Sequence, residues 1–202
     1  MKAVMISIQP KLCELIASGK KTIEVRKTRP KIGTPFKCYI YATWNGSKKE
    51  ILVKQDGLLY CEDWRKANGL QRANGKVIGE FVCDYILHSN KYAFIGDKPL
   101  TQSILKLSCL SIEDINQYRQ GKNIYAWHIS DLVIYDKPRE LGEFNKIGAT
   151  CFYNEKGVCW DRNQNDVIHC ENLDCDYKKL TTPPKSWQYV EEKENEKWNI
   201  RD

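Results

Sequence analysis

The charged residues best placed to do chemistry lie in one short segment, residues 19–31, which reads GKKTIEVRKTRPK. It contains a single carboxylate, Glu24, and six cations: Lys20, Lys21, Arg26, Lys27, Arg29 and Lys31. If the centre of this segment is a strand, Glu24 and Arg26 project to the same side, away from the apolar side chains beside them. An arginine fork next to a carboxylate can hold a phosphate or the planar edge of a base. The segment is therefore a candidate polar site for a phosphate or a planar base.

Lys21 gives this segment a second possible chemistry. A lysine near other cations loses its proton more easily, and the neutral amine can then act as a base or a nucleophile. Lys21 falls at the turn into the strand, where strand alternation does not fix the direction of its side chain. The charge pattern also fits a simpler arrangement, a solvated strand with one structural pair between Glu24 and Arg26.

Four cysteines near the end of the chain are candidate metal ligands. Cys151, Cys159, Cys170 and Cys175 fall within 25 residues, and His169 is adjacent to one of them. Tetrahedral zinc takes four nitrogen or sulfur ligands, and a short segment with few apolar residues gains folding free energy from such an ion. Four sulfur ligands leave no open position, so the zinc expected here is structural. The spacing lacks Cys-x2-Cys pairs, and the alternative is four ordinary thiols in a loop.

The remaining cysteines favour an intracellular chain. They are scattered among apolar neighbours, at Cys13, Cys38, Cys61, Cys83 and Cys109. An odd total in a chain of 202 residues does not indicate a small disulfide scaffold. We expect these five to be buried thiols that behave as small hydrophobes. No stretch approaches the ~18 apolar residues of a membrane span, and the first ten residues do not read as a secretory leader, so we expect a cytoplasmic protein.

The positive charge is concentrated in the first two-thirds of the chain. The net charge is +6, yet residues 142–202 contain nine Lys and Arg against twelve Asp and Glu. Residues 1–141 therefore contain 23 cations and 14 anions. Such an excess favours a polyanionic partner.

The pattern around the charged segment predicts the elements that position it. Val4, Ile6 and Ile8 alternate as in a strand, and Pro10 suits the first turn of a helix that ends at Gly19. A strand over residues 22–26 should follow at once.

Further along, a strand over residues 36–43 leads to Asn45-Gly46, a strong hairpin-turn pair, and residues 50–53 are the expected return strand. Trp44, beside this turn, could stack on a base. Residues 61–73 are charged and rich in Asn and Gly, which indicates a short helix in an insertion.

The second half of the domain adds strands and one clear helix start. Residues 76–87 are the most strand-like of the chain, and Ser111–Asp114 resembles a capping box for a helix that ends near Gly121. Residues 123–135 predict one or two strands. A strand and a helix followed by mostly antiparallel strands indicate an α+β protein with a small mixed β-barrel.

The sequence predicts the surroundings of three aromatic side chains and one histidine. Trp127 and His128 point to opposite faces of one strand, so only one of them can lie in the core. A structural role is the more common one for a residue such as His128, ahead of catalysis. Trp187 and Tyr189 should anchor the tail on the domain by packing.

The charged segment in its context resembles a known family. Gly19, Lys21, Glu24 and Arg26 match the G-x-K-x-x-E-x-R signature of ASCH domains, relatives of the PUA RNA-binding fold. The flanking segments come in the family's order: residues 8–10, 39–43, 76–83 and 125–128. The resemblance covers roughly residues 3–141, and chains of this type with a Cys-bearing tail resemble those of bacterial and prophage genomes.

The resemblance implies more than one activity. ASCH domains are proposed to bind RNA in the cleft lined by the signature. One bacterial branch is similar to an amidohydrolase that removes the acetyl group from acetylcytidine with a Lys, a Thr and a Glu. Its Lys aligns with Lys21, whereas its Thr position is Glu24 in this chain. Another relative is a ribonuclease.

We therefore predict an ASCH-like domain over residues 1–141 and a zinc-stapled extension over residues 142–202. The leading hypothesis is a module that binds RNA, or a modified nucleoside or nucleotide, through Lys20, Lys21, Glu24, Arg26, Lys27, Arg29 and Trp44. The alternatives are a nucleoside-processing enzyme with Lys21 as base or nucleophile and Glu24 assisting proton transfer, and a protein-interaction adaptor that uses the tail.

The metal prediction can be tested by elemental analysis. Protein purified without chelator should contain about one zinc per chain, with the four tail cysteines about 2.3 Å from the ion. His169 is the reserve ligand if one thiol is displaced. A metal-free sample whose tail is folded would show that the cysteines are ordinary thiols.

Overall fold

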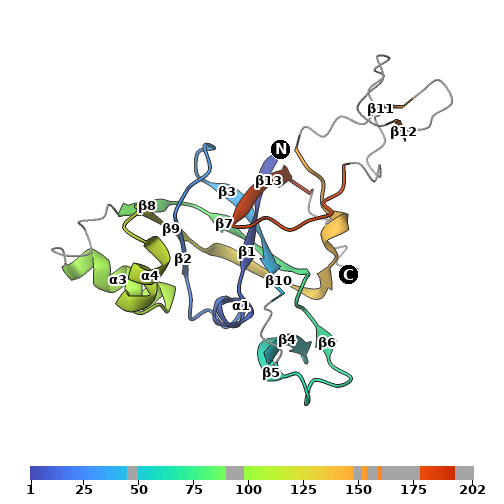
Figure 1. Cartoon of the computed structure of the whole chain (residues 1–202), viewed down its shortest axis with the longest axis horizontal. Coiled ribbons are helices and arrows are strands. Elements are labelled where there is room, and N and C mark those ends of the chain that lie inside the picture. The colour runs from blue at the N-terminus through green and yellow to red at the C-terminus, as the bar shows by residue number, and fades with distance from the viewer. Residues whose placement is uncertain (45–49, 90–97, 148–151, 154–158, 161–177, 194–202) are drawn as a thin grey trace, which may run out of the picture.

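The chain folds into sheets with helices around them (Figure 1). The computed structural model describes residues 1–44, 50–89, 98–147, 152–153, 159–160 and 178–193. The predicted α+β class is confirmed. The strands are divided among four sheets, and within the described ranges no ring of paired strands closes into a barrel.

A five-stranded sheet forms the centre of the molecule, in the order β10-β7-β3-β1-β13. Its strands are β1 (Lys2–Ile8), β3 (Phe36–Ala42), β7 (Val77–Cys83), β10 (Ser130–Arg139) and β13 (Trp187–Glu191). β1 and β3 are parallel because the chain between them crosses over through helix α1 (Pro10–Ala17). The other neighbours are antiparallel.

A second sheet of three short strands holds the charged segment. Its order is β2 (Ile23–Arg26), β9 (Ile124–His128) and β8 (Ile86–Ser89). The strand predicted over residues 76–87 is thus two strands, because the chain leaves the main sheet at Asp84-Tyr85 and enters this one.

Two helices cover the outer face of the second sheet (Figure 1). They are α3 (Lys98–Ser108) and α4 (Ile112–Arg119). The predicted capping box of α4 is confirmed: Ser111 Oγ accepts a hydrogen bond from the backbone of Asp114, whose carboxylate accepts one from the backbone of Ser111. Among the helices that the structure describes, none is both long and apolar enough to span a bilayer.

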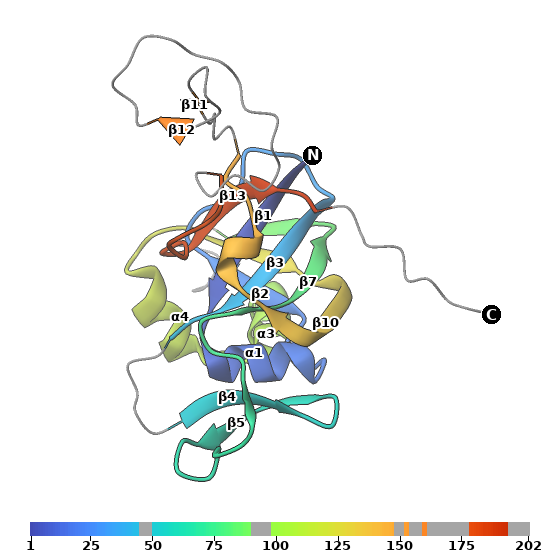
Figure 2. The same ribbon diagram turned by 90° about the vertical axis from the view of Figure 1, so that its right-hand side faces the viewer.

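A third sheet lies beyond α1, on the side away from the main sheet (Figure 2). It consists of β5 (Leu58–Asp63), β4 (Glu50–Gln55) and β6 (Gln71–Arg72). Two predictions are wrong here. β4 is not the return strand of β3, because β1 and β7 already occupy both edges of β3. The helix expected within residues 61–73 is instead the end of β5, a turn and β6.

The C-terminal part of the chain is integrated into the fold. β13 pairs antiparallel with β1 over five residues and completes the main sheet. Phe144, Leu180 and Val190 are buried in one apolar cluster with Ala3 and Met5. The described part of the predicted extension therefore shares a core with residues 1–141.

The predicted zinc ligands fall almost entirely outside the described residues. This holds for Cys151, Cys170, Cys175 and His169, while Cys159 begins a two-residue strand, β12 (Cys159–Trp160), that pairs with β11 (Phe152–Tyr153). The zinc site stays a prediction.

The close packing of β7 against β10 predicts a strong effect of a single methyl group. A Cβ atom at Gly79 would lie 2.3 Å from Val133 O and 3.1 Å from Ile134 Cα, so the two strands would have to separate. We expect Gly79→Ala to lower the free energy of unfolding by about 1–3 kcal/mol, the usual cost of an overpacked core. Urea unfolding measures it, with Gly142→Ala as the control because no atom lies within 4 Å of that added Cβ. Equal midpoints for the two variants would contradict this packing.

Candidate functional site

Strand β2 lies between two packed layers, and its side chains alternate between them as predicted. Ile23 and Val25 pack against α3 and α4. Glu24 and Arg26 point the other way, and Glu24 is in register with Trp127, a residue of the main core. The side chains of Glu24 and Arg26 are only 5% and 10% exposed. The facing layers cover both side chains, so the open cleft that the resemblance implies along the signature is not present at Glu24 and Arg26.

Lys21 is fully buried and its ammonium group is held by three oxygen atoms. Lys21 Nζ donates to Ile23 O and to Ser108 O, both at 2.8 Å, and lies 3.2 Å from Glu24 Oε2. The bond to Ser108 fixes the end of α3 to the turn before β2. In this arrangement Lys21 is a donor, so a role as base would require it to give up these contacts.

Arg26 connects the second sheet to the first. Its Nη2 atom lies 3.0 Å from Glu24 Oε1 and donates to Ser7 O in β1 at 2.6 Å. Its Nη1 atom makes a longer contact of 3.5 Å with the hydroxyl of Ser186. Glu24 thus stands between two cations, and this buried triad carries a net charge of +1.

Three buried polar atoms on this face have no hydrogen-bond partner among the described residues. They are Glu24 Oε2, Arg26 Nε and Trp127 Nε1. The first is an acceptor, although it is ion-paired with Lys21, and the other two are donors. Glu24 and Trp127 are cross-strand partners, so their side chains start about 5 Å apart on one face. The face therefore contains both kinds of hydrogen-bonding group, all of them buried.

The charge of Glu24 also acts on a neighbouring thiol. Burial and then Glu24 raise the pKa of the Cys13 thiol well above its ordinary value, against a lowering by Arg26. Cys13 is therefore a neutral, buried thiol at physiological pH, as the sequence predicts. Cys38 and Cys83 are likewise buried, whereas Cys61 and Cys109, also expected to be buried, are only half-buried.

Residues 184–189, the tail segment, close the outer side of the triad. Ser7 donates its hydroxyl to Pro184 O at 2.6 Å and its backbone N–H to Ser186 O at 2.9 Å. Trp187 Nε1 donates to Thr28 Oγ1 at 2.9 Å, and its ring packs on Trp127. The prediction that Trp187 anchors the tail by packing is confirmed.

Tyr189 gives the same anchoring a second point. Its hydroxyl accepts a hydrogen bond from the backbone N–H of Lys31 at 2.6 Å. The ring stands edge-on to Trp187, with 5.5 Å between the ring centroids. The predicted role of Tyr189 is confirmed as well.

The other cations of the charged segment lie at the two ends of β2. Lys20, before the strand, and Arg29 and Lys31, after it, are exposed, and Lys27 is half-buried. Trp44 is 63% exposed, while the turn that follows it, residues 45–49, lies outside the described residues. The structure thus separates a buried part of the signature from an accessible part.

Of the adjacent pair Trp127 and His128, only the tryptophan is in the core. Trp127 is fully buried, and His128 places Nδ1 2.7 Å from Asp84 Oδ1 and stacks on Tyr85. Although desolvation acts to raise it, the hydrogen bond from His128 and those from the backbone hold the pKa of Asp84 below its ordinary value. The structural role expected for His128 agrees with these contacts.

Sequence reasoning missed the partners of the triad. Ser7, Ser108 and Ser186 are distant from β2 in sequence, and two of them contribute backbone carbonyls, which any residue could supply. Within the described ranges, no three His, Cys, Asp or Glu side chains converge as metal ligands. The described part of the candidate site is therefore built from cations, one carboxylate and aromatic rings.

No protein-family model matches the chain, and no curated protein is significantly similar to it. Among solved structures it is similar to ASCH from Zymomonas mobilis, with 21% identity, 69% of this chain and 73% of that chain covered, and a TM-score of 0.45. For a single-substitution variant of that protein, the identity is 21%, the coverage is 69% of this chain and 74% of that chain, and the TM-score is 0.46. For the N-terminal domain of Staphylothermus marinus McrB, the identity is 11%, the coverage is 70% of this chain and 77% of that chain, and the TM-score is 0.36. The first two carry the name of the family that the sequence resembles.

The triad predicts that replacing Lys21 lowers the free energy of unfolding strongly, whereas replacing the adjacent Lys20 hardly changes it. Lys21→Met leaves two buried carbonyls without a donor, and each such loss costs about 1–3 kcal/mol, so the free energy of unfolding should fall by about 2–6 kcal/mol. Lys20→Met removes the same charge from an exposed position and should change it by less than about 0.5 kcal/mol. Denaturant unfolding compares them. Similar midpoints would mean that Lys21 is not buried.

Proposed function

We propose that this chain is a nucleic-acid-binding module whose binding surface is built on β2 and the segment that follows it. The observation that carries the proposal is the pairing of a buried, net-positive triad with accessible cations on the same thirteen-residue segment. The triad holds the segment in place. The cations beyond it are then presented from a rigid base.

The accessible cations supply contacts to the phosphate backbone. Lys20 lies at one end of β2, and Lys27, Arg29 and Lys31 lie at the other. Contacts of this kind release counterions from the nucleic acid, so they give affinity that falls with salt and does not depend on base sequence. The excess of nine positive charges in residues 1–141 acts in the same direction.

Three buried atoms of the triad face that lack a hydrogen-bond partner among the described residues would let this surface read a base once the tail segment moves away. Glu24 Oε2 accepts hydrogen bonds, while Arg26 Nε and Trp127 Nε1 donate them. A base edge offers the complementary groups. Access requires displacing Ser186, which makes the longest of the three contacts of Arg26, at 3.5 Å.

The alternative of a nucleoside-processing enzyme depends on Lys21 as base or nucleophile. That role needs a free lone pair close to the substrate. Lys21 instead donates to two carbonyls in a fully buried position. Binding is for this reason the function that the geometry supports better.

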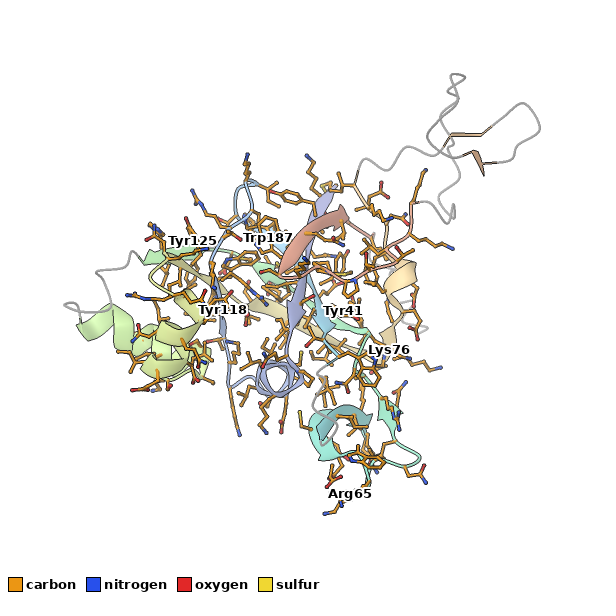
Figure 3. The ribbon with its side chains drawn as sticks, viewed as in Figure 1. Tyr41, Arg65, Lys76, Tyr118, Tyr125 and Trp187 are labelled. Atoms are coloured by element: carbon orange, nitrogen blue, oxygen red, sulfur yellow. The ribbon has the colours of Figure 1, made fainter. Side chains whose placement is uncertain are left out.

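Salt-dependent binding tests the proposal. Replacing Lys27 and Arg29 together by Ala should weaken RNA binding and make the plot of log K against log salt shallower by about 1.4, because each lost contact to a single strand removes about 0.7. The control replaces Arg65 and Lys66, an exposed pair with the same charge in the β5–β6 turn at the far end of the molecule (Figure 3).

Fluorescence anisotropy with a labelled oligonucleotide, at several salt concentrations, provides both numbers. Equal losses in the two double variants would mean that only net charge matters, and no binding by the wild type would overturn the proposal. Hydrolysis of an acetylated nucleoside by the wild type, lost in Lys21→Met at a temperature where that variant is folded, would make the enzyme the primary function.

A further inference from the structure

Three aromatic rings from three different elements converge on consecutive residues just after β2. Lys27 Nζ lies 4.8 Å above the ring of Tyr118 in α4, and Arg29 Cζ lies 6.0 Å from the ring of Tyr125 in β9. Thr28, between them, accepts the hydrogen bond from Trp187 of the tail segment. Figure 3 labels these three residues. We call Tyr118, Tyr125 and Trp187 the aromatic collar.

The collar continues across the second sheet to an exposed imidazole. His88 in β8 stacks on Tyr125 with 4.9 Å between ring centroids and 24° between planes. Arg26, Tyr125 and His88 are register partners across the three strands, so Tyr125 and His88 share the face of the triad. His88 and Arg29 are both exposed. A ring stack bordered by a guanidinium group therefore reaches solvent in the same row of the sheet as Arg26 of the triad.

We infer that the aromatic collar and His88 form a stacking platform that selects single-stranded over double-stranded nucleic acid. Unpaired bases stack on aromatic rings and on arginine planes, whereas a duplex keeps the faces of its bases covered. Lys27 and Arg29 interleave with the rings and are placed to contact the phosphates between stacked bases. This inference rests on the proposed function, since it specifies which nucleic acid that surface takes.

The collar is better suited to a nucleic acid than to an apolar peptide. Each of its two tyrosines already lies beside a cation, so the surface alternates positive charge with ring faces. A single strand likewise presents phosphates and bases together, and proteins bind it with cations and aromatic rings. A hydrophobic partner would instead require these cations to be desolvated without a counter-charge.

The test compares a labelled 12-nucleotide RNA, the DNA of the same sequence, and the blunt duplex of each. The wild type should bind the single strands at least ten-fold more tightly than the duplexes. His88→Ala and Tyr118→Ala should each weaken single-strand binding about 5- to 150-fold, the range for one lost base stack, and leave duplex binding unchanged. Both residues are exposed, so these variants should fold.

Trp64→Ala is the matched control, because Trp64 is also an exposed ring (50%, against 36% for Tyr118) but lies on the β5–β6 turn. It should leave both affinities unchanged. The platform is overturned if single strands and duplexes bind equally, or if His88→Ala and Tyr118→Ala bind single strands like the wild type. If the Lys27 and Arg29 variant still loses affinity in that case, the proposed function survives without the platform. Absence of binding to every oligonucleotide would overturn both.

Discussion

Two cations share one carboxylate in the interior of this protein, and the neighbouring elements supply the hydrogen-bond acceptors that offset the cost of burying these charges. A buried charge is costly unless it is paired and hydrogen-bonded. Lys21 meets that requirement by reaching the end of α3 at Ser108, and Arg26 meets it by reaching β1 at Ser7 and the tail at Ser186. The charged strand is therefore also the joint at which the second sheet, a helix, the main sheet and the tail are fixed together.

This joint explains how the side chains of the loop after β2, where the proposed binding residues lie, can be held in defined positions. Residues 27–29 follow directly from the anchored Arg26, and each contacts a ring of the aromatic collar. The tail segment contributes one of those rings and, through β13, an edge of the main sheet. Under the proposed function, a residue that fixes the binding surface and a residue that contacts the nucleic acid belong to the same short segment but differ in burial: Lys21 is enclosed and Arg29 is exposed.

Sequence patterns correctly predicted the features that depend on residue type and on near neighbours in the sequence. The alternation of Ile23 and Val25 with Glu24 and Arg26, the capping box at Ser111 and the anchoring by Trp187 all follow from neighbours or from residue type. The burial of Glu24 and Arg26 could not be predicted in this way, because it depends on a layer contributed by residues far along the chain. The hairpin expected from β3 failed for a related reason, since distant strands already occupy both edges of β3. The helix expected within residues 61–73 failed because pairing with β4 favours strands there.

We propose that the cations of the charged segment divide into a buried set that fixes the fold and an accessible set that binds nucleic acid. Residue-by-residue lysine acetylation, followed by mass spectrometry with and without a single-stranded RNA, measures this division. Lys21 should stay unreactive in both samples because its nitrogen is enclosed and bonded. Lys27 and Lys31 should react in the free protein and become protected by the RNA. Reaction of Lys21 in the free protein, with protection by RNA and no change at Lys27 and Lys31, would contradict the account.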